Sequence, residues 1–171
     1  KITEKVRPDT VRLIIFASDP VSFASYDCGP NLLLPVITDN NKYIGAFNWA
    51  VAEMRCRFNY FLETNQKNVD NYNQYIEKVS GYDMAEMKRM PHIFLVISEA
   101  DDIVRADEDG SITQLLLNGL IAGIHLILFS RYSERSLGLG KKRDLLKVMS
   151  RDELFDLFSG GDKSNKSKRN G

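Results

Sequence analysis

The sequence is poor in the side chains that build metal sites and disulfide frameworks. It contains two cysteines, Cys28 and Cys56, and two histidines, His92 and His125, among 171 residues. Two distant cysteines form no zinc knuckle, and one possible disulfide is not a framework, so we interpret both as reduced cytosolic thiols. Each histidine lies in an apolar run without an HxxxH or HxH partner. We therefore predict histidines of the core or of strand ends rather than metal ligands.

The sequence also lacks an excess of charge and long apolar runs. Lys plus Arg and Asp plus Glu both number 23, so the net charge is zero. This balance excludes a strong overall field for nucleic acid but leaves room for a local basic patch. No apolar run approaches the ~20 residues that span a membrane, and no signal peptide is visible. Because the chain starts at Lys1 rather than Met, the natural N-terminus can lie upstream.

Composition and patterning predict one soluble α/β domain. Hydrophobic residues make up 43% and charged residues 27%, as in ordinary globular proteins. Three nearly continuous apolar runs predict buried strands at residues 11–18, 93–97 and 124–129. Helices between these strands imply right-handed crossovers and a parallel sheet. We predict a three-layer fold with helices on both faces of the sheet, in a domain that covers residues 1–159.

The helices are predicted from apolar residues at spacings of three and four. A long helix is expected at residues 41–64, with N-caps available at residues 38–40. Its apolar stripe consists of Ile44, Phe47, Val51, Met54, Phe58 and Phe61. A second helix is indicated by Val69, Tyr72, Ile76 and Val79. A third helix is expected at residues 111–122, ended by Gly123, and its leucine-rich composition predicts that it is buried.

The chain changes character after the third strand. Residues 136–143 (SLGLGKKR) form a glycine-rich basic segment, which is a candidate for contact with nucleic acid. Its cations are Lys141, Lys142 and Arg143. Residues 151–158 (RDELFDLF) fit a short amphipathic helix. Residues 160–171 have no apolar side chain, which predicts a disordered basic tail.

The run IFLVISEADD, residues 93–102, raises the question of function. Apolar residues rich in β-formers end at Ser98 and Glu99. In α/β sheets, sites form at the carboxyl ends of parallel strands, so these two side chains are predicted to lie at such an edge. As a bare pattern, the run fits equally well a buried strand that ends in a polar loop.

Five segments, in order along the chain, resemble the motor domain of the FtsK/SpoIIIE family of DNA translocases. They are VRPDTVRLIIFASDP, LLLPVITD with AFNWAVAEMRCRFNYF, NVDNYNQ, PHIFLVISEADDI and AGIHLILFSR, which together cover most of residues 7–131. The resemblance implies a RecA-like P-loop ATPase that uses ATP and Mg²⁺, assembles as a ring and pumps double-stranded DNA through its centre. It also implies a cytoplasmic motor, often tethered to a membrane by a separate N-terminal region, that serves chromosome segregation, division, sporulation or conjugation.

The resemblance assigns roles to residues at the ends of two strands. Glu99 matches the family residue that polarises the attacking water, and Asp102 also matches a family acid. Ser98 stands where the family has an Asp that supports Mg²⁺, and a neutral hydroxyl is a weaker partner for this cation. Ser130 keeps the hydroxyl of a sensor position, although the sequence Ser130-Arg131-Tyr132 replaces the usual Thr-Gln-Arg.

Other positions are candidates for contacts with DNA or between subunits. Arg55 and Arg57 are placed on the exposed face of the long helix, and the resemblance makes them candidates for either contact. The helix around residues 116–120 lacks the basic residues that the family carries there. The region after Tyr132 is also shorter than the family leads us to expect.

The largest departure from the family is in its phosphate-binding loop. No G-x-x-x-x-G-K-[ST] motif occurs in the 171 residues. In the family this loop cradles the phosphates and lies just before the segment that matches residues 5–11. Either the motif lies upstream in a longer protein, or it has been lost. Without its strand, the sheet is expected to have a gap or an exposed edge, and a dimer then becomes an alternative to the family's ring.

These observations leave three hypotheses. In the first, the chain is part of an ATP-driven double-stranded DNA translocase. In the second, it is a catalytically inactive member of the family that serves as an interaction or ring-scaffolding module. In the third, it simply binds nucleic acid through Lys141, Lys142, Arg143 and the tail.

Overall fold

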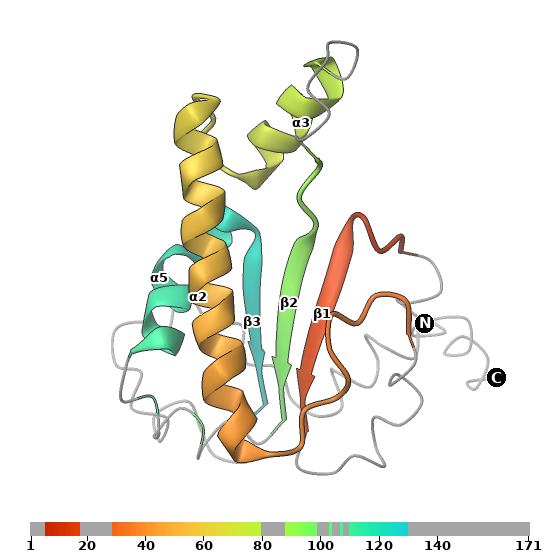
Figure 1. Cartoon of the computed structure of the whole chain (residues 1–171), viewed down its shortest axis with the longest axis vertical. Helices are drawn as coiled ribbons and strands as arrows, with labels where there is room; N and C mark the ends of the chain where they lie inside the picture. The colour runs from red at the N-terminus through yellow and green to blue at the C-terminus, as the bar shows by residue number, and fades with distance from the viewer. Residues whose placement is uncertain are drawn as a thin grey trace, which may run out of the picture.

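The fold is built on a three-stranded parallel sheet, seen in a computed structural model that describes residues 6–17, 29–79, 88–98, 103, 107 and 110–129 (Figure 1). The strands are β1 (Val11–Phe16), β2 (His92–Ile97) and β3 (Ile124–Leu128), in the order β1-β2-β3. The predicted parallel sheet is therefore confirmed. Each strand begins within one residue of its predicted start.

Three helices accompany the sheet. They are α2 (Asn40–Glu63), α3 (Val69–Val79) and α5 (Ser111–Ala122). α2 and α5 cover the same face of the sheet (Figure 1), and their side chains share one apolar cluster with alternate strand residues. α3 packs against the end of α2, where Tyr72 and Ile76 meet Phe61. The predicted bounds of α2 and α5 agree with these bounds to within one residue.

The strands are buried on both faces, as their continuous apolar runs predict. Ile14 and Leu95 belong to the cluster beneath α2 and α5. Leu13 and Val96 point to the opposite face and pack with Leu32, which lies in the segment between β1 and α2. The two clusters confirm the period of two expected for strands.

The apolar stripe of α2 begins at a different residue from the predicted one. Tyr43 is 5% exposed, whereas Ile44 is 56% exposed, so the prediction was wrong at Ile44. The Tyr43 and Phe16 rings meet edge to face at a centroid distance of 5.1 Å, and Phe47 stacks on Phe16 at 5.0 Å. Tyr43 precedes Phe47 by four residues, which places both on one face of the helix.

The prediction that α5 is buried was wrong for one face of the helix. Leu115 and Leu116 are buried, but Leu117, Leu120 and Ile121 are 51%, 69% and 45% exposed. A leucine-rich helix carries apolar residues on every side, so composition hides which side meets the sheet. Only the side toward α2 and the strands is covered among the described residues.

Both ends of α5 are capped. At its start, the Asp107 carboxylate accepts hydrogen bonds from the amides of Ile112 (3.1 Å) and Thr113 (3.3 Å), two of the amides that a helix leaves unpaired. At its end, Gly123 has φ 73° and donates to the carbonyls of the last turn. A positive φ favours glycine, so the predicted glycine at the helix end is confirmed.

The outer edge of β1 is occupied by residues 31–37. Leu13 donates to the Asn31 carbonyl at 2.8 Å and accepts from the Leu33 amide at 2.9 Å. Ile37 donates to Ile15 at 2.9 Å, which continues the pairing toward the end of the strand. This segment therefore acts as an irregular parallel neighbour of β1.

Several predictions concern residues that the structure does not describe. They are the basic segment at 136–143, the amphipathic helix at 151–158, the tail at 160–171 and the domain end at 159. Within the described ranges, no helix has the length and apolar character needed to cross a membrane.

Candidate functional site

Ser98 lies at the carboxyl edge of the sheet, where all three strands end (Figure 1). It follows β2 directly, and its amide donates to the carbonyl oxygen of Phe16, the last residue of β1, at 2.9 Å. The amide of Phe129, which follows β3, donates to the Ile97 carbonyl at 2.8 Å. The predicted location of Ser98 at this edge is therefore confirmed.

The Ser98 side chain is bound to the neighbouring strand. Its Oγ donates to the same Phe16 carbonyl at 3.2 Å, so one carbonyl accepts from both the amide and the hydroxyl of Ser98. The hydroxyl proton is therefore engaged within the sheet, and only the lone pairs of Oγ remain for another partner. A carboxylate here could not make this bond, because an ionised carboxylate has no proton to donate.

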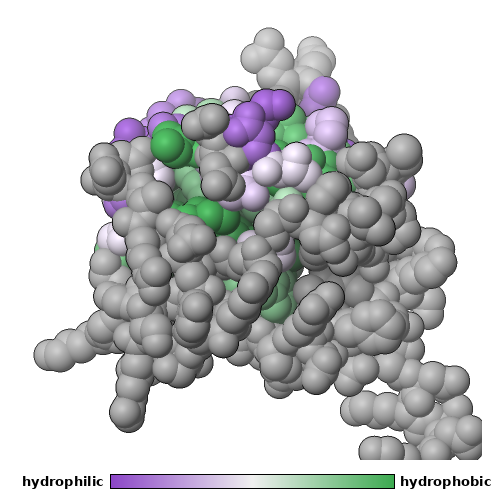
Figure 2. All heavy atoms as spheres, turned by 90° about the horizontal axis from the view of Figure 1, so that it is seen from below, coloured by the Kyte–Doolittle hydropathy of each residue, from purple (hydrophilic) through white to green (hydrophobic). Residues whose placement is uncertain are grey.

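Described residues of both apolar and polar kinds are visible from the end of the molecule toward which the strands run. Viewed from that end, the described residues include a central hydrophobic area with hydrophilic residues toward one margin (Figure 2). Ser98 itself is half-buried. Among the described residues, no group of three or more His, Cys, Asp or Glu side chains is arranged to hold a metal ion.

Most of the other predicted site residues lie outside the described part of the chain. These are Glu99, Asp102, Ser130, Arg131, Lys141, Lys142 and Arg143. The roles of Glu99, Asp102 and Ser130 stay predictions that rest on the resemblance. The contact of Lys141, Lys142 and Arg143 with nucleic acid stays a prediction that rests on the basic composition of residues 136–143.

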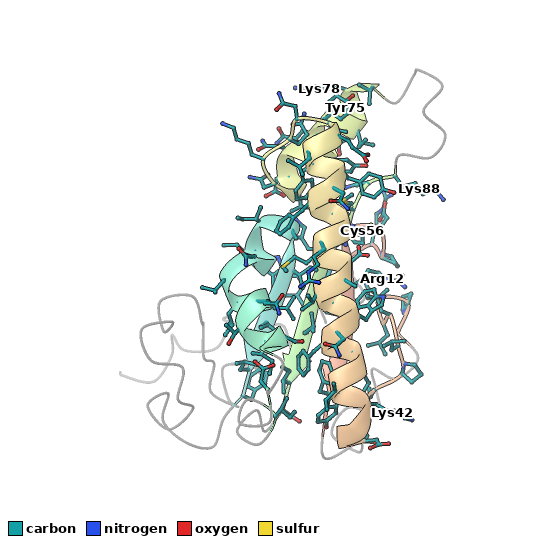
Figure 3. All side chains as sticks on the ribbon, turned by 60° about the vertical axis from the view of Figure 1, so that its left-hand side comes forward. Arg12, Lys42, Cys56, Tyr75, Lys78 and Lys88 are labelled. Carbon is teal, nitrogen blue, oxygen red and sulfur yellow. The ribbon has the colours of Figure 1, made fainter. Side chains whose placement is uncertain are left out.

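Arg55 lies on the exposed side of α2, as predicted. Its Nη2 donates to Gln114 Oε1 of α5 at 3.0 Å. The lysines of the described region are spread along the molecule: Figure 3 shows Lys42 near the start of α2, and Lys78 and Lys88 near its other end. Of the two arginines predicted to contact DNA or another subunit, Arg55 is the one that solvent and partners can reach.

The prediction that Arg57 lies on the exposed face of α2 was wrong. Its side chain is 3% exposed and pairs with Glu53 Oε1 at 2.8 Å. Nη1 donates at 2.8 Å to the carbonyls of both Pro91 and Ala122. Arg57 follows Met54 by three residues and precedes Phe61 by four, so helical geometry places it on the buried stripe. It therefore joins α2, the start of β2 and the end of α5.

A polar cluster at the opposite, amino end of the sheet was not predicted. His92 Nδ1 and His125 Nε2 are 3.0 Å apart, and His92 Nε2 is 3.2 Å from Asp70 Oδ1. The prediction of strand-end histidines is confirmed, since His92 opens β2 and His125 is the second residue of β3. Their contact follows from strand pairing, which places Phe94 opposite His125 and His92 two residues before Phe94.

A comparison with protein families decides the relationship of this chain. The model of the FtsK/SpoIIIE family matches residues 2–142, which include β1, α2, α3, β2, α5 and β3. The chain belongs to the FtsK/SpoIIIE family. This membership confirms the resemblance found in the sequence.

Individual relatives agree with the family. The chain is 34% identical over 127 residues to the DNA translocase FtsK of Clostridium tetani, which covers 72% of the chain and 16% of that protein. It is 32% identical over 130 residues to the DNA translocase SpoIIIE of Bacillus subtilis, which covers 74% of the chain and 16% of that protein. The chain thus spans about one sixth of the length of these FtsK/SpoIIIE relatives.

Solved structures support the fold. The cytoplasmic domain of the type VII secretion ATPase EccC of Thermomonospora curvata superposes with a TM-score of 0.66 at 17% identity, over 90% of this chain and 19% of that one. The conjugation coupling protein TcpA of pCW3, a structure with ATPγS, gives a TM-score of 0.57 at 17% identity, over 80% and 39%. At this identity the similarity concerns the fold alone, and the predicted RecA-like α/β class is confirmed.

Proposed function

We propose that this chain is part of an ATP-driven double-stranded DNA translocase of the FtsK/SpoIIIE type. The observation that carries the proposal is the family match over residues 2–142, within which Ser98 lies at the carboxyl edge of the sheet. Sites of α/β sheets form at this edge. The chain would contribute that edge to the motor, and it spans about one sixth of the length of its named relatives.

ATP and Mg²⁺ are the cofactors that this function requires. Ser98 would be a weak partner for Mg²⁺, because its hydroxyl brings no negative charge and offers only the lone pairs that its bond to the Phe16 carbonyl leaves open. Its free lone pairs can accept a hydrogen bond from a water molecule at this edge. We assign Glu99 to polarising the attacking water and Ser130 to sensing phosphate, as the resemblance implies. The phosphate cradle requires a G-x-x-x-x-G-K-[ST] loop from outside the 171 residues.

Partners follow from the same proposal. Double-stranded DNA is the substrate, with Arg55 as the candidate contact on α2 and Lys141, Lys142 and Arg143 as candidates in the basic segment. Arg57 is no longer a candidate for contact with DNA, because it is buried.

Copies of the chain would assemble as the ring typical of the family, or as a dimer for this chain alone. The motor would work in the cytoplasm, tethered to a membrane where a separate N-terminal region supplies an anchor.

A second candidate function is a catalytically inactive family member that acts as an interaction or ring-scaffolding module. The hydrogen bond from Ser98 Oγ to Phe16 favours it, because the residue at the metal-supporting position is used to join β1 to β2. In this case Glu99→Ala leaves every measured activity unchanged.

ATP hydrolysis by the full natural gene product, with and without double-stranded DNA, distinguishes the two. A motor hydrolyses ATP faster when DNA is present, and Glu99→Ala abolishes the turnover. A folded full-length protein without DNA-dependent turnover would contradict the translocase proposal and favour the scaffolding function.

If the basic segment binds DNA, the affinity falls steeply as the salt concentration rises, because counterions are released, and Lys141→Gln reduces the slope of this dependence. A flat salt dependence would exclude that contact.

A further inference from the structure

The outer face of α5 is apolar and exposed. Leu117, Leu120 and Ile121 are exposed, and their spacing of three and four residues places them on one side of the helix. α5 contains no charged residue, and it lies beside α2 at the margin of the described elements (Figure 1). A helix face in solvent normally carries charged or polar side chains, so this face is suited to contact with another apolar surface.

One cation borders this apolar face. Arg55 of α2 donates to Gln114 of α5 at 3.0 Å. Gln114 precedes Leu117 by three residues, so the two are neighbours on the helix and Arg55 reaches the edge of the apolar face. Because Gln114 is uncharged, this contact does not neutralise the positive charge of the exposed Arg55. The face therefore fits an occupant that combines apolar side chains with a carboxylate at their margin.

The sequence of the chain contains such an occupant. Residues 151–158 (RDELFDLF) lie outside the described ranges, and their pattern fits an amphipathic helix. At about 100° per residue, Asp152 and Glu153 stand at the two margins of the apolar side of that helix. The apolar side consists of Leu154, Phe155, Leu157 and Phe158. The segment is thus complementary to the outer face of α5 in both hydrophobicity and charge.

The chain after β3 can reach the outer face of α5. Leu128, the last residue of β3, shares one apolar cluster with Leu115 and Leu116 of α5, so the chain leaves the sheet close to this helix. As a flexible coil, residues 130–150 would span about 25 Å. This span exceeds the length of α5, about 18 Å for a helix of its size.

The size of the face favours a tethered segment over a second copy of the chain. A stable dimer buries about 800 Å² on each partner. Even a fully buried aromatic side chain contributes only about 150–250 Å², so three half-exposed aliphatic side chains offer much less than a dimer needs. A segment of the same chain needs less surface, because the linker keeps it at a high effective concentration.

We propose that residues 151–158 dock as an amphipathic helix on the outer face of α5. Their apolar side would cover Leu117, Leu120 and Ile121, and a carboxylate would pair with Arg55. An isolated helix of this length is marginal in water, so the segment is ordered only while it is docked. The proposal concerns the packing of the chain on itself, and its test uses neither ATP nor DNA, so it is independent of the proposed translocase function.

Hydrogen–deuterium exchange of the whole chain tests the docking. After correction for intrinsic rates, we expect amides of residues 151–158 to exchange about tenfold more slowly than those of residues 160–171, because docking reduces the time that they are open. Leu120→Asp should remove this protection, since it places a charge in the apolar contact. The fold should survive this substitution, because Leu120 is exposed. Equal exchange of the two segments in the wild type would overturn the proposal.

The matched control is Leu34→Asp. Leu34 is also an exposed leucine, but it lies in the segment that follows the edge of β1, at the opposite side of the sheet from β3. The slow exchange of residues 151–158 should therefore persist in this variant. If Leu34→Asp abolishes it as Leu120→Asp does, the protection does not come from docking on α5.

A charge exchange tests the contact at the margin. Arg55→Glu should weaken the protection, because it repels Asp152 and Glu153, and adding Asp152→Lys and Glu153→Lys should restore it. Failure of this rescue would rule out the pairing with Arg55.

The dependence on protein concentration identifies the occupant. Protection by a segment of the same chain is the same at all concentrations, because the contact is intramolecular. Protection that increases with concentration would show that a second copy supplies the segment, and would overturn docking within one chain.

Discussion

The Arg57 guanidinium donates to the carbonyl oxygen of Ala122 at 2.8 Å, which places a buried cation at the carboxyl end of α5. The last carbonyls of a helix carry partial negative charge and lack partners within the helix, so a cation is stabilising there. Through the same side chain, α2 is connected to the residue that precedes β2. Arg57 is therefore a structural element of the fold.

Replacing Arg57 should be costly. Arg57→Met leaves the carbonyls of Pro91 and Ala122 without this donor and Glu53 without its ion pair, so we expect the free energy of unfolding to fall by about 3 kcal/mol. Urea denaturation measures the change. The matched control is Arg55→Met, which removes an exposed hydrogen bond two residues away and should cost less than about 1 kcal/mol. Equal effects of the two variants would show that Arg57 has no special role.

Gly119 should not tolerate a methyl group, although alanine is normally the better helix former. A Cβ at position 119 would lie 2.6 Å from the carbonyl oxygen of Ile124, so α5 would have to move away from β3. We expect Gly119→Ala to destabilise the fold by about 1–3 kcal/mol. Gly45 of α2 has no atom within 4 Å of such a Cβ, and Gly45→Ala should stabilise by about 0.5–1 kcal/mol. Thermal unfolding of both variants compares the opposite signs directly.

Asn73 holds the chain that enters β2. Its amide nitrogen donates to the Met90 carbonyl at 2.9 Å, and its oxygen accepts from the Met90 amide at 2.8 Å. Because Asn73 is buried, Asn73→Ala leaves both backbone groups unpaired and should cost about 1–3 kcal/mol. Gln74→Ala, on the exposed side of the same helix, should stay within about 0.5 kcal/mol of the wild type. A loss of similar size at both positions would contradict this reading of Asn73.

Two substitutions of Ser98 should affect the stability of the fold and the ATPase activity differently. Ser98→Ala removes the bond to Phe16 and should cost about 0.5–1.5 kcal/mol. Ser98→Asp loses the same bond but places a carboxylate at the edge, where the translocase proposal predicts faster ATP hydrolysis by the full-length protein. Measuring melting temperature and turnover together tests this, with Ser98→Ala as the control for lost stability. If the aspartate raises neither binding of Mg²⁺-ATP nor turnover, the inactive-scaffold function is favoured.

The sheet was predictable because continuous apolar runs specify buried parallel strands with little ambiguity. The position of Ser98 followed, since a residue directly after such a strand must lie at the carboxyl edge. Its partner could not be predicted, because the contact with Phe16 depends on the register that places Phe16 opposite Ile97. Register is a property of two strands, and neither sequence contains it alone.

The errors at Arg57 and on α5 have a common physical origin. Arg57 was expected in solvent because arginine is rarely buried, yet the spacing from Met54 to Phe61 contains the signal for the buried side. Leu120 was expected in the core because leucine usually is buried, although a helix on one face of a sheet covers only part of its own circumference. In both cases the prediction followed the usual burial of the residue type, whereas the position of the residue on its helix determined its burial. The contact of Asp70 with His92 joins residues 22 positions apart, and only tertiary packing brings them together.

The pairing of residues 31–37 with β1 has a consequence for how this protein behaves in concentrated solution. An unpaired strand edge is a template on which a second molecule can add a strand, and such additions lead to aggregates. Here the edge of β1 already has a neighbour from its own chain, held by hydrogen bonds at Asn31, Leu33 and Ile37. Because the protecting segment follows β1 closely in sequence, it closes over the strand at a small entropic cost. The protein thus shields one side of its sheet from self-assembly with a segment of its own chain.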